Sequence, residues 1–145
     1  MSKPAQNFEN HAKFVPVFHY VMAPLLMASV LYFGYRAATA FSVENLMFFL
    51  FSVGTFLASF IARIFPLGVQ DRVIRLEERM RMERLLPDDM KARIGDFSTA
   101  QLVGLRFASD DELPDLARRV LDEGMTDRKA VKGAVKNWRA DDQRI

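Results

Sequence analysis

Residues 14–35 read FVPVFHYVMAPLLMASVLYFGY, a run of 22 residues without a formal charge. A helix rises about 1.5 Å per residue, so this run would span roughly 33 Å, enough for the hydrocarbon core of a bilayer. Residues 45–62, NLMFFLFSVGTFLASFIA, form a second uncharged run, equivalent to about 27 Å of helix. Residues 37–44 between the two runs suffice only for a tight reversal. The sequence therefore predicts an all-α membrane protein.

The predicted transmembrane hairpin covers residues 14–66, with helices at about 14–36 and 45–65. Its orientation follows from the basic residues near the helix ends, because these residues stay on the cytoplasmic side. Lys3 and Lys13 precede the first helix, Arg63 lies at the end of the second, Arg72, Arg75 and Arg79 follow it, and only Arg36 lies in the connecting loop. We therefore expect both termini, including the N-terminal segment 1–13, to be cytoplasmic. The side chains expected at the lipid headgroups are Lys13, Arg63, Arg72 and Arg75.

Two other interpretations of the apolar runs are weaker. Ala38-Thr39-Ala40 resembles a signal-peptidase site, which would make residues 1–40 a cleaved signal. The apolar core of such a signal is usually about 7 to 15 residues, however, and this run is longer. Two buried helices in a soluble domain are disfavoured because too little chain remains to cover them.

Two residues of the first run are chemically unusual there. Pro24 should kink the helix and leave the Tyr20 carbonyl without its helical donor. His19 is a candidate axial ligand for haem or chlorophyll, because a neutral imidazole serves both. A bis-histidine haem would need a second ligand at membrane depth, and His11 precedes the membrane. We therefore favour an interfacial histidine that bonds to a headgroup, a water or a neighbouring subunit, and we predict no cofactor.

The charge of the chain changes abruptly near residue 68. Residues 1–67 carry four basic and two acidic side chains, whereas residues 68–145 carry 16 of each. The net charge of +2 therefore arises in the apolar half, and the pI near 9.1 is poor evidence for a nucleic-acid partner. The chain has no cysteine, which excludes disulfides, thiolate metal sites and cysteine nucleophiles. Residues 67–145 are predicted to form a cytoplasmic helical domain.

A charge-dense stretch, VQDRVIRLEERMRMERLLP, occupies residues 69–87. Its apolar residues recur at spacings of four, three and four, which predicts one narrow seam on a helix over about 69–86. The seam residues are Val69, Val73, Leu76 and Met80. Opposite charges four residues apart predict the ion pairs Asp71–Arg75, Glu77–Arg81 and Arg79–Glu83.

Three interpretations of this helix compete. A long coiled coil is disfavoured because the seam lasts about two heptads before Pro87. A lipid-surface helix is possible, but alternating acids leave residues 71–84 with a net charge of only +1. A helix that continues out of the membrane, with its seam against the following helices or another subunit, accounts for both features. The residues expected at this interface are Val73, Leu76, Met80 and Trp138.

Start and stop signals divide the remaining chain into short helices. Ser98–Gln101 and Ser109–Glu112 match the capping box, Gly124 is a candidate C-cap, and Thr126 is the next candidate N-cap. The predicted helices lie near 88–95, 98–108, 110–123 and 126–138. One small core is expected from Leu102, Val103, Leu105, Phe107, Leu113, Leu116, Val120, Leu121, Val131, Val135 and Trp138. A compact all-α bundle follows.

The sequence contains no recognisable catalytic or phosphate-binding motif. The acids at 110–112 lie at a predicted helix start, so we assign them to capping and predict no metal site. Residues 116–139, LARRVLDEGMTDRKAVKGAVKNWR, resemble a helix-turn-helix. Val120, however, stands where that motif usually has a small residue, four before Gly124. The basic residues here also fit a solvated face or an anionic lipid surface. We predict neither an enzyme nor a nucleic-acid-binding protein.

Four segments resemble a family of small bacterial two-helix membrane proteins of unknown function. They are QNFENHAKFVPVFHYV (6–21), VQDRVIRLEERMR (69–81), LRFASDDELPDL (105–116) and AVKNWRADDQR (134–144). The block at 69–81 is the most specific of them. The resemblance implies a bacterial inner-membrane hairpin with a cytoplasmic helical tail, and it implies no activity or catalytic residues.

These features favour a non-catalytic accessory or scaffold subunit of a larger inner-membrane complex. Its partners would be the lipid bilayer and other membrane-protein subunits, with respiratory and photosynthetic electron-transfer complexes as plausible hosts. One alternative is a cofactor-carrying electron-transfer subunit built on His19. Another is a membrane-tethered regulator that binds nucleic acid or lipid through its basic helices.

Overall fold

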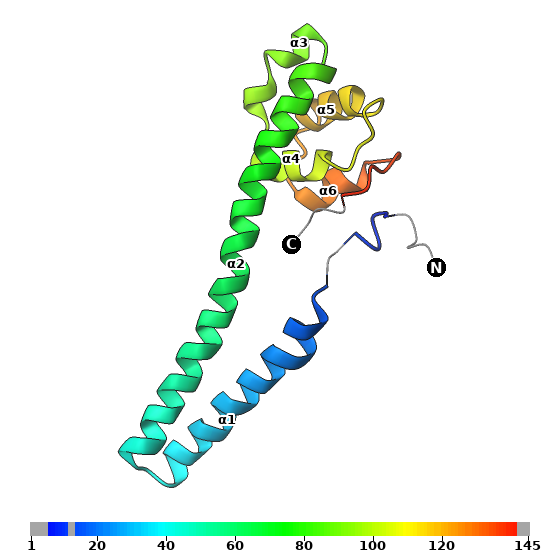
Figure 1. The fold of residues 1–145 in the computed structure, drawn as a ribbon. Helices are drawn as coiled ribbons and strands as arrows, with labels where there is room; N and C mark the ends of the chain where they lie inside the picture. Colours follow the sequence, from blue (N-terminus) through cyan, green and yellow to red (C-terminus); the bar gives the residue numbers. More distant parts are fainter. Residues whose placement is uncertain (1–5, 12–13, 142–145) are drawn as a thin grey trace. The chain divides into compact units, whose positions relative to one another are not determined.

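The computed structural model describes residues 6–11 and 14–141, and all regular elements within these ranges are helices (Figure 1). They are η1 (a π-helix, Val17–Met22), α1 (Ala23–Thr39), α2 (Val43–Leu85), α3 (Asp88–Lys91), η2 (a 3₁₀-helix, Ile94–Asp96), α4 (Thr99–Leu105), α5 (Leu113–Asp122) and α6 (Arg128–Gly133). The chain divides into two compact units. We call residues 14–67 the apolar unit, and residues 6–11 with 68–141 the C-terminal unit.

A π-helical turn directly precedes Pro24, where the sequence predicted a kink. The backbone N–H of Ala23 donates to the carbonyl of Phe18, five residues earlier, at the junction of η1 and α1. Pro24 then falls in the first turn of α1, where a missing N–H does little harm. The π-turn therefore accommodates the proline inside a long helical segment.

The turn between α1 and α2 is shorter than the sequence suggested. Helix α1 extends to Thr39 and α2 begins at Val43, so three residues connect them. The Ser42 hydroxyl accepts a hydrogen bond from the Asn45 N–H at 3.1 Å. The Asn45 side-chain amide donates to the Ala40 carbonyl at 2.6 Å. These capping bonds hold a tight turn that apolar periodicity does not reveal.

Within the apolar unit, α1 and the first part of α2 contact each other through aromatic rings. Phe33 stacks on Phe48 with ring centroids 5.2 Å apart, and Phe18 meets Phe60 edge-on at 5.8 Å. Most of the other large apolar side chains of both helices are exposed. The segments Val17–Thr39 and Val43–Leu85 are long and apolar enough to cross a membrane.

The two helices predicted at 45–65 and 69–86 are one continuous helix. Helix α2 passes through Pro66 without interruption and ends at Leu85. A proline inside a helix removes one backbone hydrogen bond, but α2 continues through Pro66, in agreement with the favoured interpretation of a helix that continues out of the membrane. The charged stretch 69–85 is thus the last part of the same helix that begins in the second apolar run.

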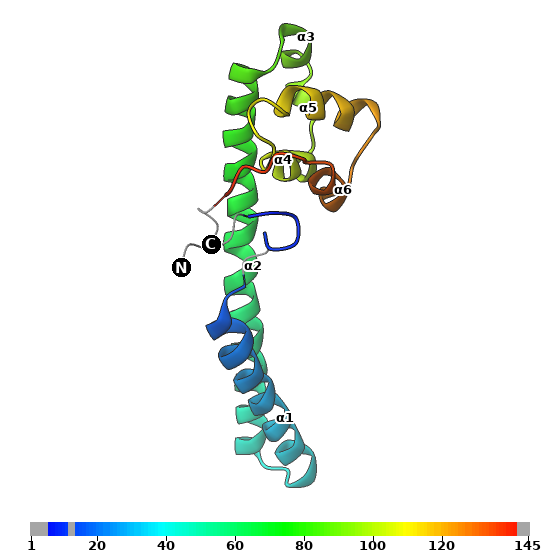
Figure 2. The same ribbon diagram turned by 90° about the vertical axis from the view of Figure 1, so that its right-hand side faces the viewer.

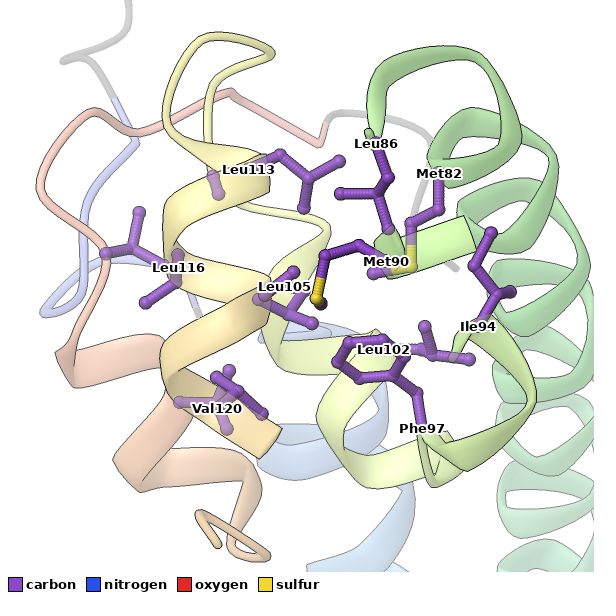
Figure 3. Close-up of a cluster of buried hydrophobic side chains, with 14 of the residues drawn as sticks. Met82, Leu86, Met90, Ile94, Phe97, Leu102, Leu105, Leu113, Leu116 and Val120 are labelled. Atoms are coloured by element: carbon purple, nitrogen blue, oxygen red, sulfur yellow. The ribbon is translucent and has the colours of Figure 1, made fainter. Parts of the chain in front are cut away.

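The core of the C-terminal unit joins the end of α2 to the short helices α3–α6. Figures 1 and 2 show α4, α5 and α6 on the same side of this part of α2. The side chains labelled in Figure 3, from the end of α2 and from α3, η2, α4 and α5, point toward one another. The cluster consists of Met82, Leu86, Met90, Ile94, Phe97, Leu102, Leu105, Phe107, Ala108, Leu113, Leu116, Ala117, Val120, Val131 and Val135. Of the predicted core residues, only Leu121 and Trp138 are half-buried at its edge.

The helix caps follow the sequence in part. Ser98 and Gln101 form the predicted capping box, and Gly124 has a positive φ of 61° after α5. At Ser109 the prediction was half right. The Ser109 hydroxyl accepts from the Glu112 N–H at 3.3 Å, but the Glu112 carboxylate accepts from the amides of residues 136 and 137 at 2.9 and 2.7 Å. The last cap is Asp127, whose carboxylate accepts from the Ala130 N–H, and not Thr126.

The predicted helix at 126–138 ends early. Helix α6 stops at Gly133, and the chain then runs alongside residues 107–109. Ser109 donates to the Asn137 carbonyl at 2.9 Å, and Arg139 donates to the Phe107 carbonyl at 2.7 Å. These hydrogen bonds between the two segments take the place of the helical hydrogen bonds that the predicted helix would have formed at residues 137 and 139.

Candidate functional site

A buried ion network lies where the last part of α2 meets the loop before α5. The Arg81 guanidinium donates to a Glu78 carboxylate oxygen at 3.0 Å, to an Asp110 oxygen at 2.6 Å and to the Ala108 carbonyl at 2.8 Å. Glu78 is only 3% exposed and Arg81 only 4% exposed. Arg139 approaches the other Glu78 oxygen at 3.7 Å. Buried charges are tolerated only when paired and hydrogen-bonded in this way.

The network replaces the helix-surface ion pairs that the sequence predicted. Arg81 pairs with Glu78, one turn away, and not with Glu77. Asp71 pairs with Arg128 of α6 at 2.8 Å and not with Arg75. Within the described ranges, the predicted Arg79–Glu83 pair does not form either. The charged residues of α2 thus bind partners distant in the sequence, which charge spacing along one helix cannot reveal.

The two acids of the network respond to their surroundings in opposite directions. Burial raises the pKa of Glu78 from its ordinary value of 4.5, because desolvation of the carboxylate outweighs the attraction of Arg81. The hydrogen bond from Arg81 lowers the pKa of Asp110 below its ordinary 3.8, since Asp110 is largely exposed and loses little solvation. Arg81 is therefore the centre of the network. Of its two acidic partners, Glu78 is harder to ionise than a free carboxyl, and Asp110 is easier to ionise.

Glu78→Gln should change how stability depends on pH. A carboxyl whose pKa is raised by folding contributes stability that is fully present below pH 4.5 and is lost as the pH rises through the raised pKa. Glu78→Gln lacks this loss, so its free energy of unfolding should rise relative to that of the wild type as the pH rises from 4.5 toward neutrality. Urea unfolding of the full chain in mild detergent, followed by the fluorescence of its single tryptophan, measures the difference.

Asp110 serves as the internal control for this pH series. Its lowered pKa contributes stability that is present above 3.8 and is lost as the pH falls through the lower value. The acid-side loss should therefore persist in both proteins. A wild-type-minus-variant difference that stays constant across the series would show that Glu78 is not desolvated in the folded protein.

A second cluster ties the N-terminal segment to α6. The His11 Nδ1–H donates to the Phe8 carbonyl at 2.6 Å, which leaves Nε2 to accept from the Lys132 ammonium at 3.0 Å. The His11 ring also lies against Phe107 and Trp138, with centroids 5.6 and 5.7 Å away. Residues 6–11 are thus part of the C-terminal unit. The sequence suggested only a free segment before the membrane.

An open groove of about 520 Å³ runs beside the ion network. Its charged lining consists of four arginines and three acids, and Arg106 is held by Asp141 at 3.1 Å. The lining residues are Gln70, Val73, Ile74, Glu77, Glu78, Arg81, Arg84, Arg106, Arg139, Ala140 and Asp141. Across residues 6–11 and 14–141 there is no group of three or more His, Cys, Asp or Glu side chains suited to a metal ion. Five of the charged side chains of the groove are held by ion pairs among Glu78, Arg81, Arg106, Arg139 and Asp141.

His19, the candidate cofactor ligand, lies in the apolar unit among aromatic rings. Its Nδ1–H donates to the Val15 carbonyl at 2.8 Å, and its ring stacks on Phe14 at 4.1 Å. Phe18 approaches the ring edge-on at 5.2 Å. The imidazole is exposed and keeps Nε2 for an outside partner. This geometry serves a headgroup or a neighbouring subunit as well as it serves a metal.

The predicted seam faces away from the core of the C-terminal unit. Leu76 and Met80 are each 62% exposed, and Val69 and Val73 are also exposed. The face of α2 that packs on the short helices carries Ile74, Glu78, Arg81, Met82 and Leu86 instead. Of the two alternatives for the seam, packing on the following helices is therefore wrong, and docking of Val73, Leu76 and Met80 on another subunit stays a prediction. Trp138 is half-buried against Phe107, 4.8 Å away, and its partner role is likewise untested.

The remaining predicted positions are distributed along the chain. Of the expected headgroup contacts, Lys13 lies outside the described residues, Arg72 is exposed, and Arg63 and Arg75 are half-buried. The helix-turn-helix interpretation loses two of its basic residues to internal partners. Arg128 pairs with Asp71, and Lys132 is buried beside His11.

A family model described as "Family of unknown function (DUF6526)" matches the chain over residues 1–145. No curated protein and no solved structure matches it.

Proposed function

The chain belongs to DUF6526, a family of unknown function, and for this member we propose a non-catalytic accessory or scaffold role in a larger bacterial inner-membrane complex. The two apolar segments would form a transmembrane hairpin that anchors the chain. The C-terminal unit would lie on the cytoplasmic side as a small helical bundle and dock a partner subunit.

Membrane insertion is supported by the exposure of the apolar unit. In the apolar 18-residue stretch of Val17–Thr39 no residue is buried. In the corresponding stretch of Val43–Leu85 only 6% of the residues are buried. A core helix of a soluble protein would be largely covered by its own chain. The aromatic contacts of Phe33 with Phe48 and of Phe18 with Phe60 support an antiparallel pair within the bilayer. The distribution of basic residues around the hairpin supports cytoplasmic ends.

The scaffold role rests on a single observation, the exposed apolar seam Val69–Val73–Leu76–Met80 on a rigid helix. The seam follows the membrane segment directly, and the opposite face of the helix is fixed by the core and the ion network. Apolar faces of this kind mark protein interaction sites when they are left uncovered. The groove beside it offers ion pairs and no reactive constellation, which supports a role without catalysis.

Two measurements test this role. The full chain should partition with the membrane fraction, and reporter fusions at both ends should give cytoplasmic signals. Purification in mild detergent followed by mass spectrometry should then recover a stoichiometric assembly that is lost in Leu76→Glu. Recovery of the chain as an isolated monomer, or in the soluble fraction, would contradict the proposal.

A further inference from the structure

We propose that the seam on α2 is covered by a second copy of this chain, as a short parallel two-stranded coiled coil. This inference deepens the scaffold role and rests on it, because two copies inserted in one membrane have the same orientation. Spacings of four, three and four place Val69 and Leu76 at d positions of a heptad, and Val73 and Met80 at a positions. At the centre of the seam, the β-branched Val73 at a with Leu76 at d is the combination that favours two parallel strands.

The charges beside the seam favour the same partner. Arg72 occupies a g position and Glu77 the following e position, five residues later. In a parallel dimer, g of one helix lies beside e of the next heptad on the other helix. Two Arg72–Glu77 pairs would therefore flank the Val73–Leu76 layers by symmetry. Both side chains are exposed, and neither forms an ion pair within the described parts of the chain.

The neighbouring residues limit the seam to this short stretch. An antiparallel pairing would set Arg72 against Arg79, two like charges. In the parallel pairing the next g–e contact, Arg79 with Arg84, is unfavourable, but Arg84 is attracted toward Asp110 of its own chain. Glu83 takes the following d position and ends the apolar seam. A seam of two heptads is weak alone, so the membrane must raise the effective concentration of the two copies.

Cysteine crosslinking of the full chain in native membranes tests the partner directly. The chain has no cysteine of its own, so Leu76→Cys introduces a single thiol. In the proposed dimer two such thiols face each other across the seam, and mild oxidation should give a disulfide-linked homodimer. Arg75→Cys, on the adjacent position outside the seam, is the matched control and should give several-fold less dimer.

Charge exchange tests the register. In the Leu76→Cys background, Arg72→Glu or Glu77→Arg alone should cause a several-fold loss of crosslinked dimer, because each sets like charges opposite each other. The double exchange should restore the dimer. If the single exchanges weakened the dimer only by destabilising the helix, the double exchange would not restore it. Restoration would therefore show that residues 72 and 77 contact each other through opposite charges.

The other outcomes separate this inference from the proposed function. A monomer in the membrane fraction, or equal crosslinking of Leu76→Cys and Arg75→Cys, overturns the dimer and leaves membrane anchoring intact. A Leu76→Cys product that contains a different protein overturns the second copy and supports the accessory role. A chain found only in the soluble fraction overturns the proposed function, and the dimer with it, because nothing then aligns the two copies.

Discussion

Arg81→Met is expected to lower the free energy of unfolding of the C-terminal unit by about 3–5 kcal/mol. Arg81 is 4% exposed and is the shared partner of Glu78, Asp110 and the Ala108 carbonyl. Methionine fills a similar volume without donors, so the buried Glu78 carboxylate would keep only the longer contact with Arg139, at 3.7 Å, as a counter-charge. The measurement is urea unfolding of the full chain in mild detergent, followed by the fluorescence of Trp138.

Two variants make this result specific. Arg118→Met removes an exposed pair with Asp89, 2.8 Å away, and should change stability far less. Glu78→Gln added to Arg81→Met should recover part of the loss, because it removes the stranded charge. Equal effects of Arg81→Met and Arg118→Met would mean that the network contributes no more than a surface ion pair.

Gly104→Ala is expected to destabilise the same unit by about 1–3 kcal/mol through overpacking. A Cβ at Gly104 would lie 2.7 Å from both Cβ and Cγ1 of Val131, and 3.4 Å from the Arg128 carbonyl oxygen. Both neighbours belong to α6, so the added methyl group must push α6 away from α4. The loss should appear as a lower urea midpoint with an unchanged transition slope.

Gly95→Ala is the matched control for this substitution. A Cβ at Gly95 would meet no atom within 4 Å, and Gly95 lies in the short helix η2 of the same unit. The same chemical change should therefore leave the midpoint unchanged or raise it slightly. A similar loss in both variants would indicate that close packing of α4 on α6 is not the cause.

Much of the helical outline was accessible from local sequence signals. The helices over the uncharged runs, the Ser98 capping box and the helix end at Gly124 each depend on residues close together in the chain. The structure contains all three features. The core positions of α4 and α5 were equally clear from apolar spacing. The ends of the helices were not, because Ser42 and Asp127 cap through side chains whose role depends on the path of the following chain.

Local sequence signals did not predict the buried ion pair of the candidate site. Hydropathy placed the interior face of residues 69–86 on the apolar seam, because it scores Glu78 and Arg81 as solvent-facing residues. The folded chain buries these two instead, because Asp110, the Ala108 carbonyl and Arg139, 27 to 61 residues later, supply their partners. Residues 6–11 joined the C-terminal unit for the same reason, through Lys132 at a separation of 121 residues.

The amino-acid sequence was therefore sufficient for the helical class, the two membrane-length segments and the apolar seam, since each depends on composition or on spacing within a few turns. The tertiary structure decided which face of α2 is covered and which is left exposed. Its physical basis is that a buried charge becomes tolerable only when distant groups neutralise it and complete its hydrogen bonds. An apolar face, in turn, remains outside when the chain has already covered the opposite side of the same helix.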